Sequence, residues 1–181
     1  DAPALKAAHI GVAMGITGTA VTREAATMVL TDDNFATIVR AVEEGRVVYD
    51  NIVNFVRFQL STNIGAILTV LMATLLGWHA PFSAIQLLWI NIIMDGPPAM
   101  TLGIEPARLG IMLERPRQKS AQILTAHRLA RLMLYGTTMM VGTLSIFRYG
   151  VAAHGQSYAL TLAFTTFVLF QFFNVFNARA E

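Results

Sequence analysis

The sequence predicts a mainly α-helical protein: a polytopic transmembrane bundle of four spans, joined by a long cytoplasmic stalk helix to a small α/β piece. Of the 181 residues, 55% are hydrophobic and only 13% are charged, and the mean hydropathy is +0.55. Soluble domains carry about 25% charged residues. No charged residue occurs from Phe58 to Met94, so this stretch is apolar enough to enter a bilayer.

Residues 1–33 have the composition of a water-soluble segment. Pro3 suits the first turn of a short helix, and Gly15 and Gly18 suit a turn. Helices and strands are expected in alternation, as in an α/β layer, over residues 2–8, 9–14, 21–26 and 27–30. Because 33 residues cannot bury a core alone, we expect this piece to complete a larger cytoplasmic domain that lies upstream.

Residues 34–57 predict an amphipathic stalk helix, with acidic and capping residues at Thr31–Asn34 before its start. Apolar and charged residues are interspersed along it, and nothing breaks the pattern before residue 76. One continuous helix from 34 to 76 would be roughly 65 Å long. The soluble and membrane parts would then be joined by one rod.

Four spans are expected within 58–181, over residues 58–76, 83–104, 129–147 and 158–177. Six Lys and Arg residues follow the second span, whereas the segments 77–82 and 149–157 contain none. The positive-inside rule therefore places the N-terminal piece, the loop 105–128 and the C-terminus in the cytoplasm. The short loops favour a bacterial plasma membrane.

The composition disfavours several other classes. The net charge is only +2, so no nucleic-acid partner is expected, and the basic residues are explained by topology. There is no cysteine, which excludes disulfides and thiolate metal sites. The four histidines are scattered, so a zinc site is not expected.

Asp95 is an acid inside an otherwise apolar stretch, and it is the first candidate ion ligand. A carboxylate at that depth costs a few kcal/mol or more, so it needs a partner or a function. Asn91 lies four residues earlier, on the same helix face. Pro97 and Pro98 lack N–H groups and free the carbonyls of two preceding residues. Such hard oxygen ligands suit Ca²⁺. The alternative is that Asp95 is protonated or paired and that Asn91 joins helices.

Four further polar residues lie within the spans. Asn63, beside Gly65 and Ala66, is either an ion ligand or a helix–helix hydrogen-bonding residue, and the two small residues would let the second span approach closely. Gln171, Asn174 and Asn177 are spaced by three on the last span. They either face an ion path or hold helices together.

These residues resemble those of a known family. Asp1-Ala2-Pro3-Ala4-Leu5-Lys6 resembles the end of the T-G-D-G-x-N-D-A-P-A-L motif in the HAD-like phosphorylation domain of P-type cation ATPases. Tyr49-Asp50-Asn51-Ile52 and Leu88 to Ala99 resemble the fifth and sixth membrane helices of the calcium-pump branch. The Met94-Asp95-Gly96-Pro97-Pro98 form is most similar to secretory-pathway and bacterial calcium pumps. The chain would then comprise the end of the phosphorylation domain (1–33), the stalk (34–57) and membrane helices five to eight (58–181).

The resemblance implies an ATP-driven translocase that carries Ca²⁺ and uses Mg²⁺. Asp1 would help to hold the phosphate and Mg²⁺ in place, and Asn63, Asn91 and Asp95 would be ion ligands. The phosphorylated aspartate, the ATP site and the first four membrane helices belong to upstream domains of the polypeptide. The chain alone would therefore be inactive. Its other partners would be the lipid bilayer and the transported cation.

Departures from the family pattern bear on the ion. The two-calcium pumps have Glu, Thr and Glu where this sequence has Ala66, Met94 and Gln171. The first of their two sites should be missing, so one ion per cycle is expected. Secretory-pathway pumps tend to have Gln where Met100 stands, a position linked to Mn²⁺ selection. A pump for Na⁺, K⁺ or Mn²⁺, or a secondary cation transporter, remains the alternative.

Overall fold

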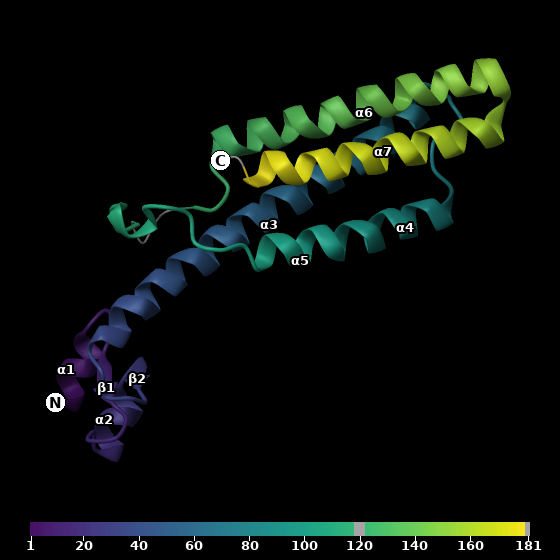
Figure 1. Cartoon of the computed structure of the whole chain (residues 1–181). Coiled ribbons are helices and arrows are strands. Elements are labelled where there is room, and N and C mark those ends of the chain that lie inside the picture. Colours follow the sequence, from purple (N-terminus) through teal and green to yellow (C-terminus); the bar gives the residue numbers. More distant parts are fainter. Residues whose placement is uncertain (118–121, 180–181) are drawn as a thin grey trace. The chain divides into compact units, whose positions relative to one another are not determined.

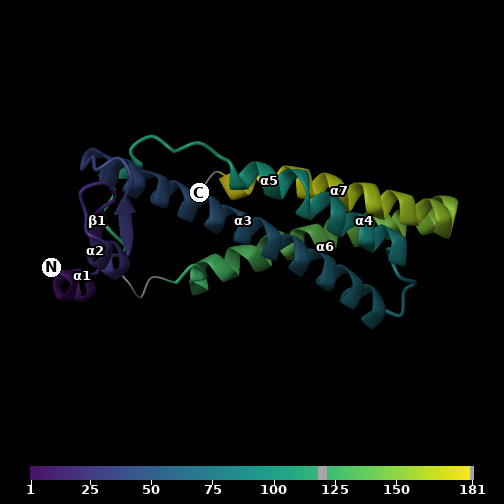
Figure 2. The same cartoon turned by 90° about the horizontal axis from the view of Figure 1, so that it is seen from below.

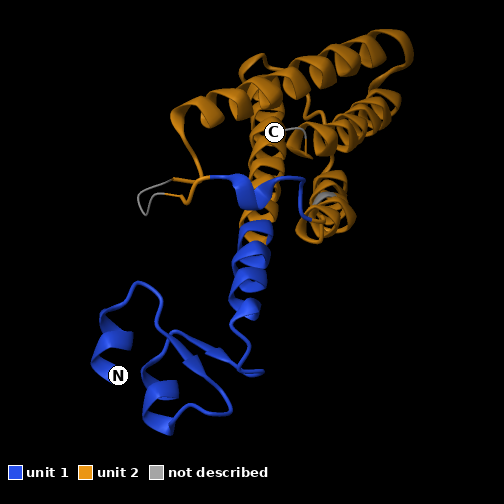
Figure 3. Cartoon of the chain, turned by 60° about the vertical axis from the view of Figure 1, so that its left-hand side comes forward, with its two compact units in different colours: residues 1–47, 107–114 blue, residues 48–106, 115–181 orange. Residues whose placement is uncertain are grey.

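The computed structural model describes residues 1–117 and 122–179, except for the side chains of Met94 and Asp95. The chain divides into two compact units (Figure 3). Unit 1 comprises Asp1–Val47 and Ala107–Glu114, and unit 2 comprises Val48–Pro106 and Arg115–Glu181. The long helix α3 begins in unit 1 and continues in unit 2.

The N-terminal part of unit 1 is the predicted α/β piece (Figure 1). Strands β1 and β2 form a parallel pair in which Val12 lies opposite Met28. The first strand begins later than predicted, because residues 8–10 form a bend. The elements are α1 (Ala2–Ala7), β1 (Val12–Met14), α2 (Ala20–Ala25) and β2 (Met28–Leu30).

Asp33 holds the loop that follows β1. Its carboxylate accepts hydrogen bonds from the amides of Ile16 (2.9 Å) and Thr17 (2.7 Å) and from the Thr17 hydroxyl (2.7 Å). These donors, the Ile16 amide foremost, lower the pKa of Asp33 to about 2. A hydrogen bond from Thr37 likewise lowers the pKa of the neighbouring Asp32. Two adjacent carboxylates therefore stabilise the segment just before α3.

Helix α3 (Ala36–Leu75) confirms the prediction of one continuous helix through residues 34–76. Its 40 residues correspond to about 60 Å of unbroken helix. The helix ends at Leu75. In the turn that follows, Gly77 has a φ of +68°, a conformation that glycine adopts without the steric cost of a Cβ. The first apolar segment is thus the second half of a longer rod.

The predicted second span is two helices, α4 (Ala84–Asp95) and α5 (Pro97–Gly103). Helix α4 starts with a reciprocal capping box, in which the Ser83 hydroxyl accepts from the Gln86 amide and the Gln86 side chain accepts from Ser83. Gly96 separates the helices, with φ −86° and ψ −111° outside the helical region. The break predicted from the Gly-Pro-Pro sequence is therefore confirmed.

Helices α6 (Ala126–His154) and α7 (Gln156–Arg179) are the predicted third and fourth spans, each several residues longer than expected. They pack along each other as a hairpin whose turn is at Gly155, where φ is +84° (Figures 1 and 2). Three helices in the described part of the chain are long and apolar enough to cross a membrane: α3, α6 and α7.

The core of unit 2 is built from α3 to α7. Phe82 and Phe167 meet edge-to-face with ring centroids 5.3 Å apart, a favoured aromatic arrangement. The other members of this buried cluster are Phe58, Ile90, Leu102, Met139, Phe147, Ala159, Ala163 and Ala178.

Gly65 packs against α6, and the prediction that it admits the second span is wrong. A Cβ at Gly65 would lie 3.1 Å from the Met139 sulfur, and one at Gly136 would lie 3.1 Å from the Gly65 nitrogen. The two glycines thus let the backbones of α3 and α6 approach closely, as small residues do in membrane helix pairs. Hydropathy cannot show which neighbour such a residue faces.

Candidate ion-binding site

The candidate site is centred on the junction between α4 and α5. The Gly96 amide donates to the carbonyl of Ile92 at 3.2 Å and makes the last hydrogen bond of α4. Pro97 has no N–H group, so the carbonyl of Ile93 loses its usual partner four residues on, and Pro98 has the same effect on Met94. Helix termini also leave carbonyls unpaired. The junction therefore concentrates carbonyl oxygens at one point of an apolar segment.

The two strongest candidate ligands lie on the last turns of α4. Asn91 and Asp95 are four residues apart, so the helix places them on one face. Asn91 is exposed. The side chain of Asp95 lies outside the described residues. The role predicted for this pair stays a prediction.

Asn63 lies on α3, in the half of that helix belonging to unit 2, and is partly buried. The neighbouring Thr62 is 3% exposed, and Ser61 is 1% exposed. The Ser61 hydroxyl donates back to the Phe58 carbonyl at 2.9 Å. A polar band therefore crosses α3 at this level.

The three amide side chains of α7 have different surroundings. Asn174 donates to the Ser61 hydroxyl at 2.7 Å in a buried setting, so it joins α7 to α3. Asn177 is exposed. Gln171 is 0% exposed, and within the described residues neither atom of its amide has a hydrogen-bonding partner. The three residues are evenly spaced in the sequence, but their surroundings in the structure differ.

Asp1 is exposed at the start of α1. It lines an open cavity of about 400 Å³ in unit 1, together with residues of β1 and the loop that follows, among them Met14, Thr17 and Gly18. An exposed carboxylate offers the oxygen ligands that Mg²⁺ takes. Its catalytic role stays a prediction.

Contacts of the 105–117 loop were missed by the sequence analysis. In unit 1, Arg46 of α3 donates to the carbonyls of Ile111 (2.7 Å) and Glu114 (3.0 Å). Ile111 begins a short 3₁₀ turn, η1 (Ile111–Leu113), and Glu114 directly follows it. In unit 2, the Asn51 amide donates to the carbonyls of Gly103 (3.2 Å) and Glu105 (3.0 Å). Arg46 thus binds the loop after α5 to α3, and Asn51 binds both the last residue of α5 and the loop after it.

Arg117 makes a third such contact in unit 2. Its guanidinium lies 2.6 Å from an Asp50 carboxylate oxygen and 3.3 Å from the centre of the Tyr49 ring. Tyr49, Asp50 and Asn51 had been noted only as part of a family-like motif. Their partners could not be predicted from the neighbouring sequence, because the residues that they contact are more than 50 positions away.

No group of three or more His, Cys, Asp and Glu side chains that could hold a metal is found within residues 1–117 and 122–179. The remaining candidate ligands are the amides, carbonyls and single carboxylate described above.

Residues 79–181 match the family model described as "Cation transporting ATPase, C-terminus". The chain belongs to this family of cation-transporting ATPases. The match begins just before α4 and covers all of α4 to α7. The predicted resemblance to P-type cation ATPases of the calcium-pump branch is confirmed.

Curated relatives align over nearly the whole chain. Calcium-transporting ATPase type 2C member 1 of Homo sapiens is 47% identical over 185 residues, which cover 100% of this chain and 20% of the relative. Calcium-transporting ATPase 1 of Schizosaccharomyces pombe is 44% identical over 182 residues (100% and 20%). Calcium-transporting ATPase 1 of Saccharomyces cerevisiae is 46% identical over 181 residues (99% and 19%). The chain thus spans about a fifth of the length of these cation-transporting ATPases.

Proposed function

We propose that the chain is the ion-translocating part of an ATP-driven P-type Ca²⁺ pump and that it crosses the membrane four times. The observation that carries the proposal is the break between α4 and α5, next to Asn91 and Asp95. Broken helices expose backbone carbonyls to ions within membranes. The names of the relatives, all calcium-transporting ATPases, support Ca²⁺ as the cargo.

In this proposal α4 and α5 together form the second span. Asn91, Asp95 and Asn63 supply ion ligands, and the carbonyls of residues 93 and 94 add to them. Carboxylate, amide and carbonyl oxygens are the ligand types of Ca²⁺ sites.

Residues 1–33 would complete the phosphorylation domain upstream, with Asp1 near the phosphate and Mg²⁺. ATP and Mg²⁺ would be bound mainly by upstream domains, so the isolated chain would not pump. Helix α3 would carry the conformational change toward the ion site. An unbroken helix suits this role, because it moves as a rod rather than bending at a hinge.

The contacts of Arg46, Asn51 and Arg117 support a route for this coupling. Each ties a loop segment that follows α5 to α3 through hydrogen bonds of 2.6–3.2 Å. A displacement of α3 would therefore be transmitted to the backbone that leaves the broken span. The cytoplasmic loop 105–128 would be the part that moves with the stalk; residues 118–121, Lys119 among them, lie outside the described part.

A pump for Na⁺, K⁺ or Mn²⁺ is the second candidate function. The observation that favours it is the presence of Ala66 and Met94, whose side chains offer no oxygen ligand. The secondary-transporter alternative has lost its support, since the chain belongs to an ATPase family. The relatives named above come from eukaryotes and give no support to a bacterial plasma membrane.

The test uses the full-length protein in membrane vesicles and measures phosphoenzyme formed from ATP as Ca²⁺ is varied. We expect Ca²⁺ to activate phosphorylation and Asp95→Asn to abolish that activation. Glu44→Gln, the same carboxylate-to-amide change at an exposed position of α3, should leave it intact. Activation by Na⁺, K⁺ or Mn²⁺ instead of Ca²⁺ would show that the pump carries a different cation. If no phosphoenzyme forms with any of these ions, the proposal of an ATP-driven pump is refuted.

A further inference from the structure

A cleft rich in arginine lies within unit 2, beside the middle of α3, the start of α6 and the end of α7. It encloses about 20 Å³ and opens to the outside. Three arginines line it: one belongs to α3 and two belong to α6. Its main polar residues are Arg57, Arg128, Arg131, Tyr135, Asn174 and Asn177.

The charge of the cleft favours an anion. Among the described residues that line it, three are arginines and none is acidic. Arg57 is 9% exposed and Arg128 is partly buried. Arg128 donates through NH1 to the Ile123 carbonyl at 2.8 Å, but a guanidinium has five N–H donors and suits phosphate oxygens in a fork geometry. Arg128 also lies in the first turn of α6, where the helix dipole adds partial positive charge.

The cleft lies at the predicted level of the membrane surface. Arg57 directly precedes the apolar segment of α3, Arg128 and Arg131 lie where the third span begins, and Asn177 lies where the fourth ends. These three ends share the predicted cytoplasmic side. Phospholipid phosphates lie at this depth, just outside the hydrocarbon core.

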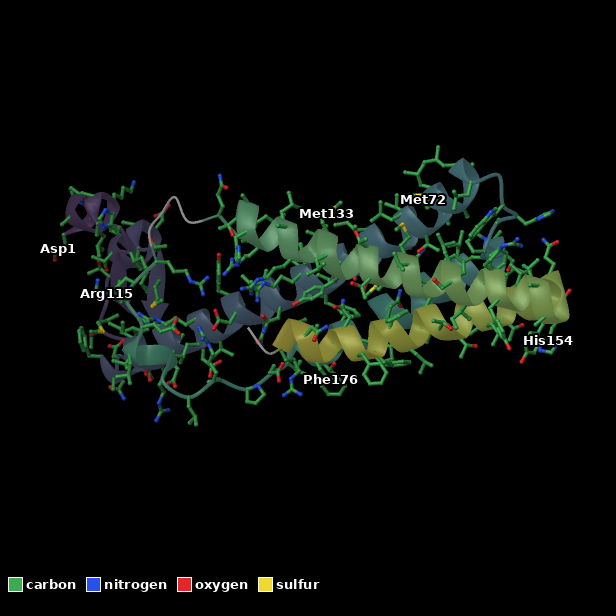
Figure 4. All side chains as sticks on the ribbon, turned by 90° about the horizontal axis from the view of Figure 1, so that it is seen from above. Asp1, Met72, Arg115, Met133, His154 and Phe176 are labelled. Atoms are coloured by element: carbon green, nitrogen blue, oxygen red, sulfur yellow. The ribbon has the colours of Figure 1, made fainter. Side chains whose placement is uncertain are left out.

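Exposed apolar side chains lie next to residues that line the cleft, on the part of α6 and α7 predicted to enter the membrane. Met133 is 43% exposed, Leu134 is 62% exposed and Phe176 is 62% exposed. Figure 4 shows Met133 on α6 and Phe176 on α7, in the halves of these helices that form the cleft. A ligand with acyl chains would cover such surface, whereas a free phosphate ion would leave it bare.

We propose that this cleft binds the phosphate of an anionic phospholipid from the cytoplasmic leaflet. A volume of about 20 Å³ holds roughly one water-sized group. The enclosed part therefore accepts a phosphate oxygen, while the rest of the headgroup stays at the open mouth and the acyl chains lie along α6 and α7. Neither Asn63 nor Asn91, the proposed ion ligands whose side chains are described, lines this cleft. The lipid proposal rests on the proposed membrane placement and does not depend on which cation is carried.

The experiment titrates lipid into the full-length protein in detergent micelles and counts bound lipid by native mass spectrometry. The probes are phosphatidylglycerol and phosphatidylcholine, each with and without millimolar inorganic phosphate. The variant is Arg128→Gln/Arg131→Gln. The control is Arg115→Gln/Arg148→Gln, which removes the same charge from positions that do not line the cleft.

We expect phosphatidylglycerol to bind more tightly than phosphatidylcholine and to resist inorganic phosphate. Losing two guanidinium groups should weaken its binding about thirtyfold, and the control should bind as the wild type does. Equal weakening by both variants, or none by either, would overturn the proposal. Displacement of the lipid by inorganic phosphate would reassign the cleft to a soluble anion and overturn the lipid assignment.

A second measurement does not depend on the folding of a variant. A photoactivatable phosphatidylglycerol should crosslink the wild-type protein within residues 126–135 or 174–178. Crosslinks found only elsewhere would refute the site, even if the double variant failed to fold.

Discussion

At the scale of single residues, the polar side chains of this chain differ in their hydrogen-bond partners. Asn174 has a buried partner in Ser61 at 2.7 Å, whereas Gln171, one turn away, is buried with no partner among the described residues. An unsatisfied buried amide costs about 1–3 kcal/mol. Asp33 shows the opposite case, because three donors surround its exposed carboxylate. A polar side chain with partners thus contributes to stability, whereas a buried polar side chain without them lowers it.

Asp33 predicts an acid sensitivity of the loop after β1. Its pKa is lowered from the ordinary 3.8 to about 2, so its stabilising effect is complete above pH 3.8 and is lost as the pH falls toward 2. Carbon NMR of the Asp33 carboxyl in the full-length protein should show a midpoint near 2. Thr17→Val removes one hydroxyl donor and should raise the pKa. A wild-type midpoint near 3.8 would contradict the hydrogen-bonded geometry.

At the scale of elements, close helix contacts and helix breaks come from a few small or cyclic residues. Pro97 and Gly96 divide one apolar segment into α4 and α5. Gly65 and Gly136 bring α3 and α6 together. Gly45 lies in the exposed part of α3, where a Cβ would meet nothing within 4 Å. Glycines that are alike in sequence therefore have opposite consequences in the structure.

Two glycine substitutions should change stability in opposite directions. In Gly136→Ala the new Cβ would lie 2.6 Å from the Ile64 Cγ2 methyl, and such overpacking costs about 1–3 kcal/mol. Gly45→Ala should stabilise α3 by about 0.5–1 kcal/mol through helix propensity. Thermal unfolding of the chain in detergent micelles, followed by circular dichroism, measures both. Stabilisation by Gly136→Ala would show that α3 and α6 are not in close contact.

At the scale of the whole molecule, the chain combines a small α/β piece with long apolar helices. Its described residues form two compact units that share α3. It spans about a fifth of the length of its curated relatives. The proposed pump cycle therefore needs the full-length protein, and the expectation that this chain alone is inactive stays a prediction.

Ion stoichiometry is the prediction that belongs at this scale. By the family resemblance, we expect Ala66, Met94 and Gln171 to stand where two-calcium pumps have oxygen ligands of their first site. We therefore expect one bound Ca²⁺ per phosphorylation site, measured with radioactive calcium on the full-length protein in vesicles. Asn91→Ala should lower the affinity for this ion, whereas Asn177→Ala should leave it unchanged. Two ions per phosphorylation site would refute the single-site interpretation.

Much of the architecture follows from local chemistry that the sequence displays. Hydropathy predicted the three long apolar helices, and the lack of a breaker predicted the continuous helix α3. Pro97 and Pro98 predicted the break after Asp95. These features depend on backbone hydrogen bonds and residues close in sequence, so they can be read without knowing any neighbour.

Partnerships between distant segments were decided only by the tertiary structure. Gly65 faces α6 rather than the second span, and Arg46 and Asn51 hold backbone more than 50 residues away. Such contacts depend on how each helix is rotated and at which level it meets the next. The sequence of one helix does not specify which neighbour each of its faces meets, so packing between helices decides which side chains come together.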